Sequence, residues 1–287
     1  MQTSTSRDSQ KAFTLVEMAI VLVIIGLLVG AVFAGQSLLR NSQVTQVLTD
    51  AKTYATAIQQ FKDKYAYLPG DFPEATRVWG RLKATADCVT NSSASLDATG
   101  GVCDGDGNGI MNGVASAAGA SSESFQLWRQ LQLAGFITGS FTGLNGPLNT
   151  NYDTIPKTNV PSGAIANTGF WHYSWGYSPA STTFYEGNYD NTLAYGGRVA
   201  NDWIHGPALY GKEAFALDTK VDDGLPPTGT IRTLAQSWQL GVNGVSCTSS
   251  DTAASATYTK GDTSPTCFLL FMNNFQVSSQ QGTFTQP

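Results

Sequence analysis

A single acidic residue, Glu17, lies near the start of a long apolar segment. A polar leader ends at Ala12, Phe13 follows it, and no charged residue occurs from Met18 to Gly35. A run of this length can cross a bilayer as a helix, which takes roughly 20 mostly apolar residues. A carboxylate in a membrane segment costs free energy, so such a residue usually has a function and a partner. We therefore expect Glu17 to have both.

A second candidate site lies in the sequence DGDGNG. Asp104, Asp106 and Asn108 place side-chain oxygens at alternate positions, and a glycine follows for a sharp turn. This arrangement matches the first half of a calcium loop, in which Ile110 would offer its backbone carbonyl. An alanine stands where an EF-hand has its closing glutamate, and Glu123 is expected to supply that carboxylate. The sequence predicts a calcium site here, and a soluble Gly/Asp turn is the alternative.

Three further acids, Asp218, Asp222 and Asp223, stand at the end of a predicted helical turn, before a glycine and two prolines. They form a weaker candidate for a second cation site. A helix end with solvated acids is the alternative.

Aromatic side chains alternate along one short run: Phe170, Trp171, Tyr173, Trp175 and Tyr177. Such runs usually belong to strands whose aromatic residues pack in the core and pair across strands. We expect that packing role. The alternative is an aromatic face that stacks on sugars or on a partner protein.

Catalytic motifs are not evident in the sequence. The only histidines are His172 and His205, and no G-x-S-x-G motif or similar context surrounds a serine. With no C-x-x-C and two histidines, a zinc site is not expected. We expect a protein without enzymatic activity.

The composition is that of a weakly charged, acidic chain. Charged residues make up 13% of 287 residues and the net charge is −5, whereas about a quarter of residues is usually charged. The surface is expected to be rich in Gly, Ser, Thr and Asn, as on many secreted proteins. A net acidic chain without Lys/Arg clusters argues against nucleic-acid binding.

Four cysteines form two pairs that are local in sequence, Cys88 with Cys103 and Cys247 with Cys267. Disulfides persist in oxidising compartments, and four cysteines permit three connectivities. The pairing of sequence neighbours is the simplest of the three. Free buried cysteines are the alternative.

One long helix is expected to position the N-terminal residues, from Phe13 to Tyr65. After the apolar run, hydrophobic residues recur at three- and four-residue spacing, which marks one apolar helical face. At 1.5 Å per residue this helix would be roughly 80 Å long. The residues of that face are Val44, Val47, Leu48, Ala51, Ala55, Ile58, Phe61 and Tyr65.

Shorter elements follow in the rest of the chain. Asp71 is expected to cap a short helix that has Pro73 in its first turn. A second helix should bury Phe125, Trp128 and Leu131 and end at a glycine. Candidate strands, from their aromatic and β-branched runs, are 170–177, 193–199, 229–234 and 267–272.

The N-terminal stretch resembles that of type IV pilins and type II secretion pseudopilins. The residues that carry the resemblance are the polar leader, the FTLVE sequence from Phe13 to Glu17 and the apolar run after it. In that family the leader is cut before the Phe and the new terminal Phe is N-methylated. Carried over, cleavage falls between Ala12 and Phe13, and Phe13 is methylated. The family usually has Gly at the position of Ala12.

The resemblance also gives Glu17 a partner. The free amine of Phe13 in an incoming subunit would pair with Glu17 of its neighbour, so that neither charge is buried alone. Gly26 and Gly30 form a G-x-x-x-G spacing that permits close helix approach, although glycine is also common in membrane helices. Two alternatives remain for the segment, a secretory signal peptide cut after Ala34 and a plain membrane anchor, and both leave Glu17 unexplained.

The sequence thus predicts an α+β, pilin-like fold with a long helix packed on a head with an antiparallel sheet. We expect a leader (1–12), a transmembrane assembly half of the helix (13–36), a head-packing half (37–66) and a periplasmic or extracellular head (67–287). The family implies a filament subunit that waits in the inner membrane. Its implied partners are other pilins or pseudopilins, a prepilin peptidase and an inner-membrane assembly platform. The alternative is a membrane-anchored periplasmic binding module or adhesin for sugar or protein.

Overall fold

The computed structural model describes residues 14–81, 101–111, 121–147, 152–235 and 246–272. The chain divides into two compact units, Met1–Gln43 and Val44–Pro287. The first helix, α1 (Leu15–Tyr65), contributes residues to both units. It confirms the long helix that the sequence predicts.

In the first unit, α1 is apolar without being buried. Among the described residues it is the one helix long and apolar enough to cross a membrane, with a mean hydropathy of 2.8 over its most apolar window. Its large apolar side chains from Leu15 to Leu39 are each at least 47% exposed. This part of the helix therefore has no covering layer among the described residues.

In the second unit, the remainder of α1 buries most of the face that the spacing predicts, although Ala55 and Tyr65 are only partly buried. Tyr54 lies against two other elements, with ring centroids 5.3 Å from Trp128 and 5.0 Å from Phe170. The buried residues of this part are Val44, Val47, Leu48, Ala51, Ala57, Ile58 and Phe61. The helix ends at Tyr65, and the following turn contains Ala66 and Gly70, both with positive φ.

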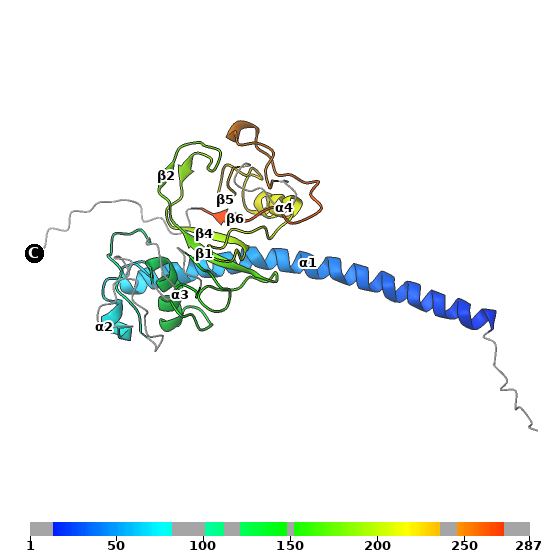
Figure 1. The fold of residues 1–287 in the computed structure, drawn as a ribbon, viewed down its shortest axis with the longest axis horizontal. Coiled ribbons are helices and arrows are strands. Elements are labelled where there is room, and N and C mark those ends of the chain that lie inside the picture. The colour runs from blue at the N-terminus through cyan, green and yellow to red at the C-terminus, as the bar shows by residue number, and fades with distance from the viewer. Residues whose placement is uncertain (1–13, 82–100, 112–120, 148–151, 236–245, 273–287) are drawn as a thin grey trace, which may run out of the picture. The chain divides into compact units, whose positions relative to one another are not determined.

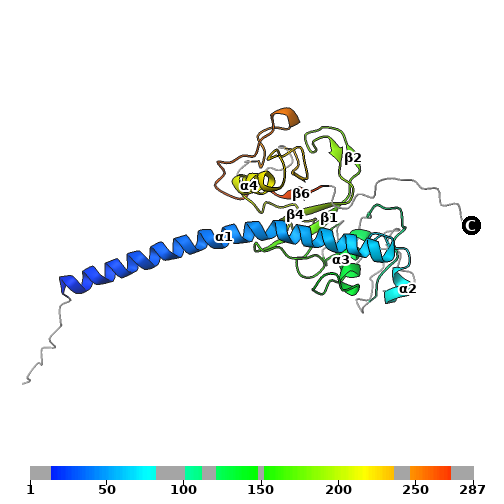
Figure 2. The same ribbon diagram turned by 180° about the vertical axis from the view of Figure 1, so that it is seen from behind.

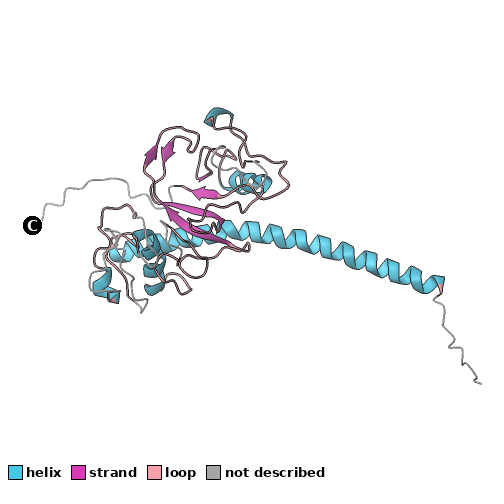
Figure 3. Cartoon of the chain, in the orientation of Figure 1, coloured by secondary structure: helices cyan, strands magenta, loops and turns pink. Residues whose placement is uncertain are grey.

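An antiparallel sheet forms the centre of the second unit (Figures 1 and 3). Its strand order is β1-β4-β6-β5, with Thr168 opposite Gly197 at one end of the β1/β4 ladder. A separate two-stranded ribbon joins β2 to β3. The strands are β1 (Thr168–Tyr173), β2 (Tyr177–Ser178), β3 (Gly187–Asn188), β4 (Thr192–Gly197), β5 (Ile231–Arg232) and β6 (Leu269–Phe271).

Within the described residues, three further α-helices and one short 3₁₀ helix accompany the sheet. They are α2 (Ala75–Trp79), α3 (Glu123–Leu133), α4 (Gly211–Val221) and the 3₁₀ helix η2 (Ala253–Ser255). In both ribbon views α3 lies beside the last turns of α1, and α2 lies near the end of that helix (Figures 1 and 2). The predicted helix at Phe125, Trp128 and Leu131 is confirmed, and all three side chains are fully buried.

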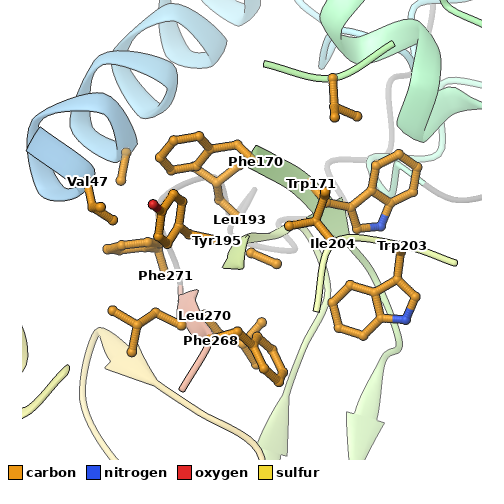
Figure 4. Packing of buried hydrophobic residues seen from close by; sticks show 14 of the residues in the cluster. Val47, Phe170, Trp171, Leu193, Tyr195, Trp203, Ile204, Phe268, Leu270 and Phe271 are labelled. Atoms are coloured by element: carbon orange, nitrogen blue, oxygen red, sulfur yellow. The ribbon is translucent and has the colours of Figure 1, made fainter. Parts of the chain in front are cut away.

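One hydrophobic cluster joins α1, α3 and the sheet in the second unit. Val47 of α1 faces Phe170, Tyr195 and Phe271 from three neighbouring strands (Figure 4). Since each buried apolar side chain of this size contributes roughly 1.5–3 kcal/mol of transfer free energy, the α1 face and the sheet stabilise one another. The fold class predicted from the sequence, α+β with an antiparallel sheet, is confirmed.

The disulfide between Cys247 and Cys267 is present, with the Cα atoms 4.7 Å apart. It confirms the predicted C-terminal pair and fixes the loop before β6. Cys103 is also disulfide-bonded, and its predicted partner, Cys88, lies outside the described residues.

Candidate functional site

Glu17 lies in the first turn of α1 and closes a reciprocal hydrogen-bonded cap. The backbone N–H and the hydroxyl of Thr14 donate to Glu17 Oε2 at 2.8 and 2.9 Å. The Glu17 N–H donates to Thr14 Oγ1 at 3.2 Å. This is the arrangement of a capping box, which satisfies backbone donors that a helix start leaves free. Ala12 and Phe13 lie outside the described residues.

The apolar surface after Glu17 covers the whole circumference of the helix. A single-faced apolar stripe would indicate packing on one neighbour, whereas apolar residues all round indicate a buried or membrane helix. A Cβ added at Gly26 or Gly30 would meet no atom within 4 Å outside the adjacent turns of the helix itself. The large exposed residues are Leu15, Val16, Met18, Ile20, Val21, Leu22, Val23, Ile24, Ile25, Leu27, Leu28, Val29, Val32, Phe33, Leu38 and Leu39.

A comparison with protein families identifies a known motif in this segment. Residues 7–33 match the prokaryotic N-terminal methylation motif. The chain carries the signature of type IV pilins and pseudopilins. No curated protein and no solved structure matches the chain.

The motif and the apolar helix together fit a pilin-like or pseudopilin subunit that is anchored in a membrane. The motif implies processing by a prepilin peptidase and assembly with other pilins. It points to a structural subunit and away from an enzyme.

A second candidate site joins three carboxylates in the head. Asp71, Asp106 and Glu123 each place an oxygen within 4.8 Å of the other two. Asp71 and Glu123 are buried, at 1% and 0% exposure, and Asp106 is exposed. Carboxylate oxygens are the ligands that calcium prefers. The structure therefore brings two of the predicted ligands, Asp106 and Glu123, together with an unpredicted third.

The cluster is assembled by backbone contacts between its three segments. Asp71 accepts hydrogen bonds from the N–H groups of Asn108 and Gly109, at 3.1 and 2.8 Å. Glu123 Oε1 accepts one from the Asp106 N–H at 3.0 Å. A Cβ at Gly105 would collide with the Asp71 backbone, so only glycine permits this approach.

Without a bound cation, ionising all three carboxylates of the cluster costs free energy. Burial raises the pKa of Asp71 to about 7, and the neighbouring Asp106 acts in the same direction. A bound divalent cation would reverse both effects, because it favours the ionised carboxylates.

The other predicted ligands have different positions. Asp104 turns away from the cluster and accepts hydrogen bonds from the Thr76 N–H and hydroxyl, at 2.8 and 2.7 Å. The Asn108 amide bridges the loop, since it donates to Asp106 Oδ2 and accepts from the Ile110 N–H. Ile110, whose backbone carbonyl was the remaining predicted ligand, belongs to the same loop and follows Gly109.

The prediction that Asp71 caps the short helix is wrong. Helix α2 begins at Ala75, and the Asp104 carboxylate, from a distant loop, binds its first turn at Thr76. Asp71 is the ligand that sequence reasoning missed. Its only signal was an acid directly after the helix-ending Pro69–Gly70 pair.

The acids at the end of α4 lie within 4.8 Å of one another but bind the loop that follows. Asp218 accepts hydrogen bonds from the Tyr258 hydroxyl at 2.8 Å and the Gly224 N–H at 3.1 Å. Asp222 accepts from the Thr230 N–H, and Asp223 accepts from the Leu225 N–H at 2.8 Å. Their oxygens therefore already serve as structural acceptors.

The aromatic run divides at the end of β1. Phe170 and Trp171 are buried at 0% and 2% exposure, which confirms the core role for this part. Trp175 and Tyr177, beyond the strand, are 63% and 64% exposed. His172 is buried in β1, and burial lowers its pKa to about 3, so it is neutral at physiological pH. His205 follows β4 in the chain, and its Nδ1 lies 3.0 Å from the Trp203 carbonyl.

Proposed function

We propose that this chain is a structural subunit of a type IV pilus or a type II secretion pseudopilus. A prepilin peptidase cuts between Ala12 and Phe13, Phe13 is N-methylated, and α1 assembles the subunits into a helical filament. The observation that carries the proposal is the methylation motif at residues 7–33, continuous with the apolar surface of α1.

The exposed apolar residues have a role both before assembly, in the membrane, and after assembly, in the filament. In the inner membrane the lipid tails cover them, since a helix of this length spans the hydrocarbon core. In the filament the same side chains pack against copies of α1 from other subunits. A contiguous apolar surface of this extent marks an interaction with a membrane or with protein.

Glu17 supplies the register between subunits. In the membrane or filament core its carboxylate is stabilised by a cationic partner. The methylated amine of Phe13 in the neighbouring subunit is that partner. Extraction from the membrane depends on the inner-membrane platform, and the finished filament lies in the periplasm or on the cell surface.

The mass of the N-terminal peptide of the mature protein, taken from a membrane fraction, tests the processing step. We expect a chain that begins at Phe13 and carries one extra methyl group. The same protein from a strain without its prepilin peptidase should begin at Met1. A mature chain that begins at Gly35, or an uncut chain in the normal strain, would contradict the proposal.

We further propose that Asp71, Asp106 and Glu123 bind calcium in the head. Three carboxylates from three segments converge, and two of them are buried. Calcium would join the turn after α1, the 104–109 loop and the start of α3. It would thus stabilise the part of the head in which these three segments meet.

Thermal unfolding of the full chain, with calcium or with a chelator, tests this site. We expect calcium to raise the midpoint by roughly 5 °C and Asp106→Asn to abolish that rise. Asp104→Asn is the matched control, because it changes an acid of the same loop that faces Thr76. An equal loss of the calcium effect in both variants would contradict the three-carboxylate site, and so would an unchanged response of Asp106→Asn.

A further inference from the structure

A pocket of about 340 Å³ opens in the head between β1, α3 and the loops that follow β1 and β4. Its size is typical of small-molecule sites, which occupy about 300–1,000 Å³. The neighbouring residues Trp171 and Trp203, which both line it, are shown in Figure 4. All of its lining residues belong to the second unit of the chain.

Phe, Trp and Tyr rings form half of the wall, six of its twelve lining residues. Trp175 stacks on Phe184, with ring centroids 5.8 Å apart and an interplanar angle of 17°. Tyr173 stacks on Trp203 at 4.7 Å and 25°. Trp175 is 63% exposed and Phe184 is 8% exposed, so the indole forms an accessible edge above a buried ring. A ligand with a flat, weakly polar face would gain contact on such a surface.

The polar groups of the wall are neutral. No Asp, Glu, Lys or Arg is among the lining residues, which include the hydroxyls of Ser124, Ser174 and Thr183. A charged ligand would therefore enter this pocket without an ionic partner among the described residues and would lose its hydration. The chemistry of the wall selects an uncharged ligand.

Among the lining residues, His172 carries a buried polar atom without a regular hydrogen bond. His172 is 1% exposed, its Nδ1 lies 3.4 Å from Ser124 Oγ, and its ring also interacts with the Asn191 side chain, but its Nε2 makes no hydrogen bond of normal geometry within the described part of the chain. A buried polar atom without a partner costs free energy. Since His172 lines the pocket, a ligand hydroxyl that reaches this nitrogen would remove that cost.

We propose that this pocket binds a single neutral sugar residue, as presented on a glycan. A pyranose ring has faces of C–H groups that stack on aromatic rings and an edge of hydroxyls that meet His172, Ser124 and Thr183. An aromatic side chain of a partner protein would also stack on the aromatic rings of the pocket. It would offer few hydrogen-bonding groups to the polar residues of the wall. This inference rests on the head alone and holds for a pilus or a pseudopilus subunit.

Titration of the full chain with methyl glycosides of glucose, galactose, mannose and N-acetylglucosamine tests the proposal. The protein is kept in a detergent without a sugar headgroup, and tryptophan fluorescence is recorded. We expect at least one glycoside to give a saturable change in the millimolar range, and Trp175→Ala to weaken its binding about tenfold. Failure of all four glycosides would overturn the proposal.

Tyr177→Ala is the matched control. Tyr177 is as exposed as Trp175 and belongs to the same aromatic run, yet it does not line the pocket. Its replacement should leave the affinity unchanged. An equal loss in both variants would show that sugars bind the exposed aromatic edge and not the pocket, which contradicts the proposal.

The two histidines provide an independent measurement. Because the chain contains only His172 and His205, a His205→Asn variant assigns both imidazole signals in a nitrogen-detected NMR spectrum. We expect the bound glycoside to shift Nε2 of His172 more than the nitrogens of His205, which meets the pocket only through Trp203. Binding of N-acetyltyrosinamide in place of the glycosides would overturn the sugar proposal in favour of a peptide partner.

Discussion

The two parts of α1 are both rich in apolar residues, but they differ in what covers them. From Leu15 to Leu39 the large apolar side chains are at least 47% exposed. In the second part Val47, Ile58 and Phe61 are at most 1% exposed. The first part is apolar on all sides, whereas the second has one apolar face and one polar face.

The difference shows where each part finds its partners. The second part is stabilised by contacts within its own chain, and its polar face is adapted to water. The first part has no such contacts among the described residues, so its stability depends on lipid or on other subunits. One continuous helix thus combines a part that packs in the head with an uncovered part, to which the proposed function assigns assembly.

The largest expected effect concerns the acid of the first part. Glu17→Ala should abolish filament assembly, because the amine of the incoming subunit then lacks its partner. The protein should accumulate in the membrane fraction, and no filaments should be recovered after shearing. Asp63→Ala, which removes an exposed acid from the second part of α1, should assemble normally. If the Glu17→Ala variant still formed filaments, Glu17 would not be required for assembly.

Two phenylalanines of α1 compare the parts directly. Phe61→Ala should lower the free energy of unfolding of the head by about 3–5 kcal/mol, because it leaves a cavity in the core. Phe33, at 68% exposure, should give a change within about 0.5 kcal/mol when replaced by Ala. Denaturant titration of the detergent-solubilised chain measures both. A similar loss for the two variants would contradict the division of the helix.

The smallest expected effect concerns an acid whose partners lie inside the chain. Burial raises the pKa of Asp218 to about 7, above its unfolded value of about 3.9. A raised folded pKa gives stability that is complete below pH 4 and is lost as the pH rises through 7. The unfolding midpoint should therefore fall between pH 5 and pH 8, by roughly 3 °C from this residue.

Asp218→Asn is the variant that checks this. An amide resembles the protonated acid, because it can donate to the Tyr258 hydroxyl and accept from the Gly224 N–H. The pH dependence of the midpoint should become smaller in this variant, whereas Asp63→Asn should leave it unchanged. An undiminished slope would show that other groups cause the dependence.

Periodic patterns in the sequence predicted the regular elements well. The apolar spacing from Val44 to Tyr65 identified the buried face of α1, and the predicted strands at 193–199 and 267–272 correspond to β4 and β6. These features depend on the local alternation of apolar and polar residues. The Cys247–Cys267 disulfide was also predictable, because the two residues are close in sequence.

Contacts between distant segments were not predictable in the same way. The sequence predicted that Asp71 would cap α2 and that Asp104 would be a cation ligand, whereas the structure places Asp104 at the start of α2 and Asp71 in the acidic cluster. The two were exchanged because a helix cap and a cation ligand require the same residue type. Only the folded chain shows that Asp104 reaches Thr76 and that Asp71 meets Asp106. Likewise, the alternation from Phe170 to Tyr177 gave no signal that the strand ends at Tyr173, which leaves Trp175 exposed.

The strand order has a consequence for the timing of folding. Strand β6 lies between β4 and β5, yet it is the last of the described strands to be synthesised. The β1/β4 pair can form early, but β5 pairs only with β6 in this sheet, so the sheet stays incomplete until Phe271 has left the ribosome. Long-range pairings of this kind form slowly and leave edges exposed meanwhile. A chain already held at the membrane by α1 would complete its head while its unpaired strands are kept apart from those of other chains.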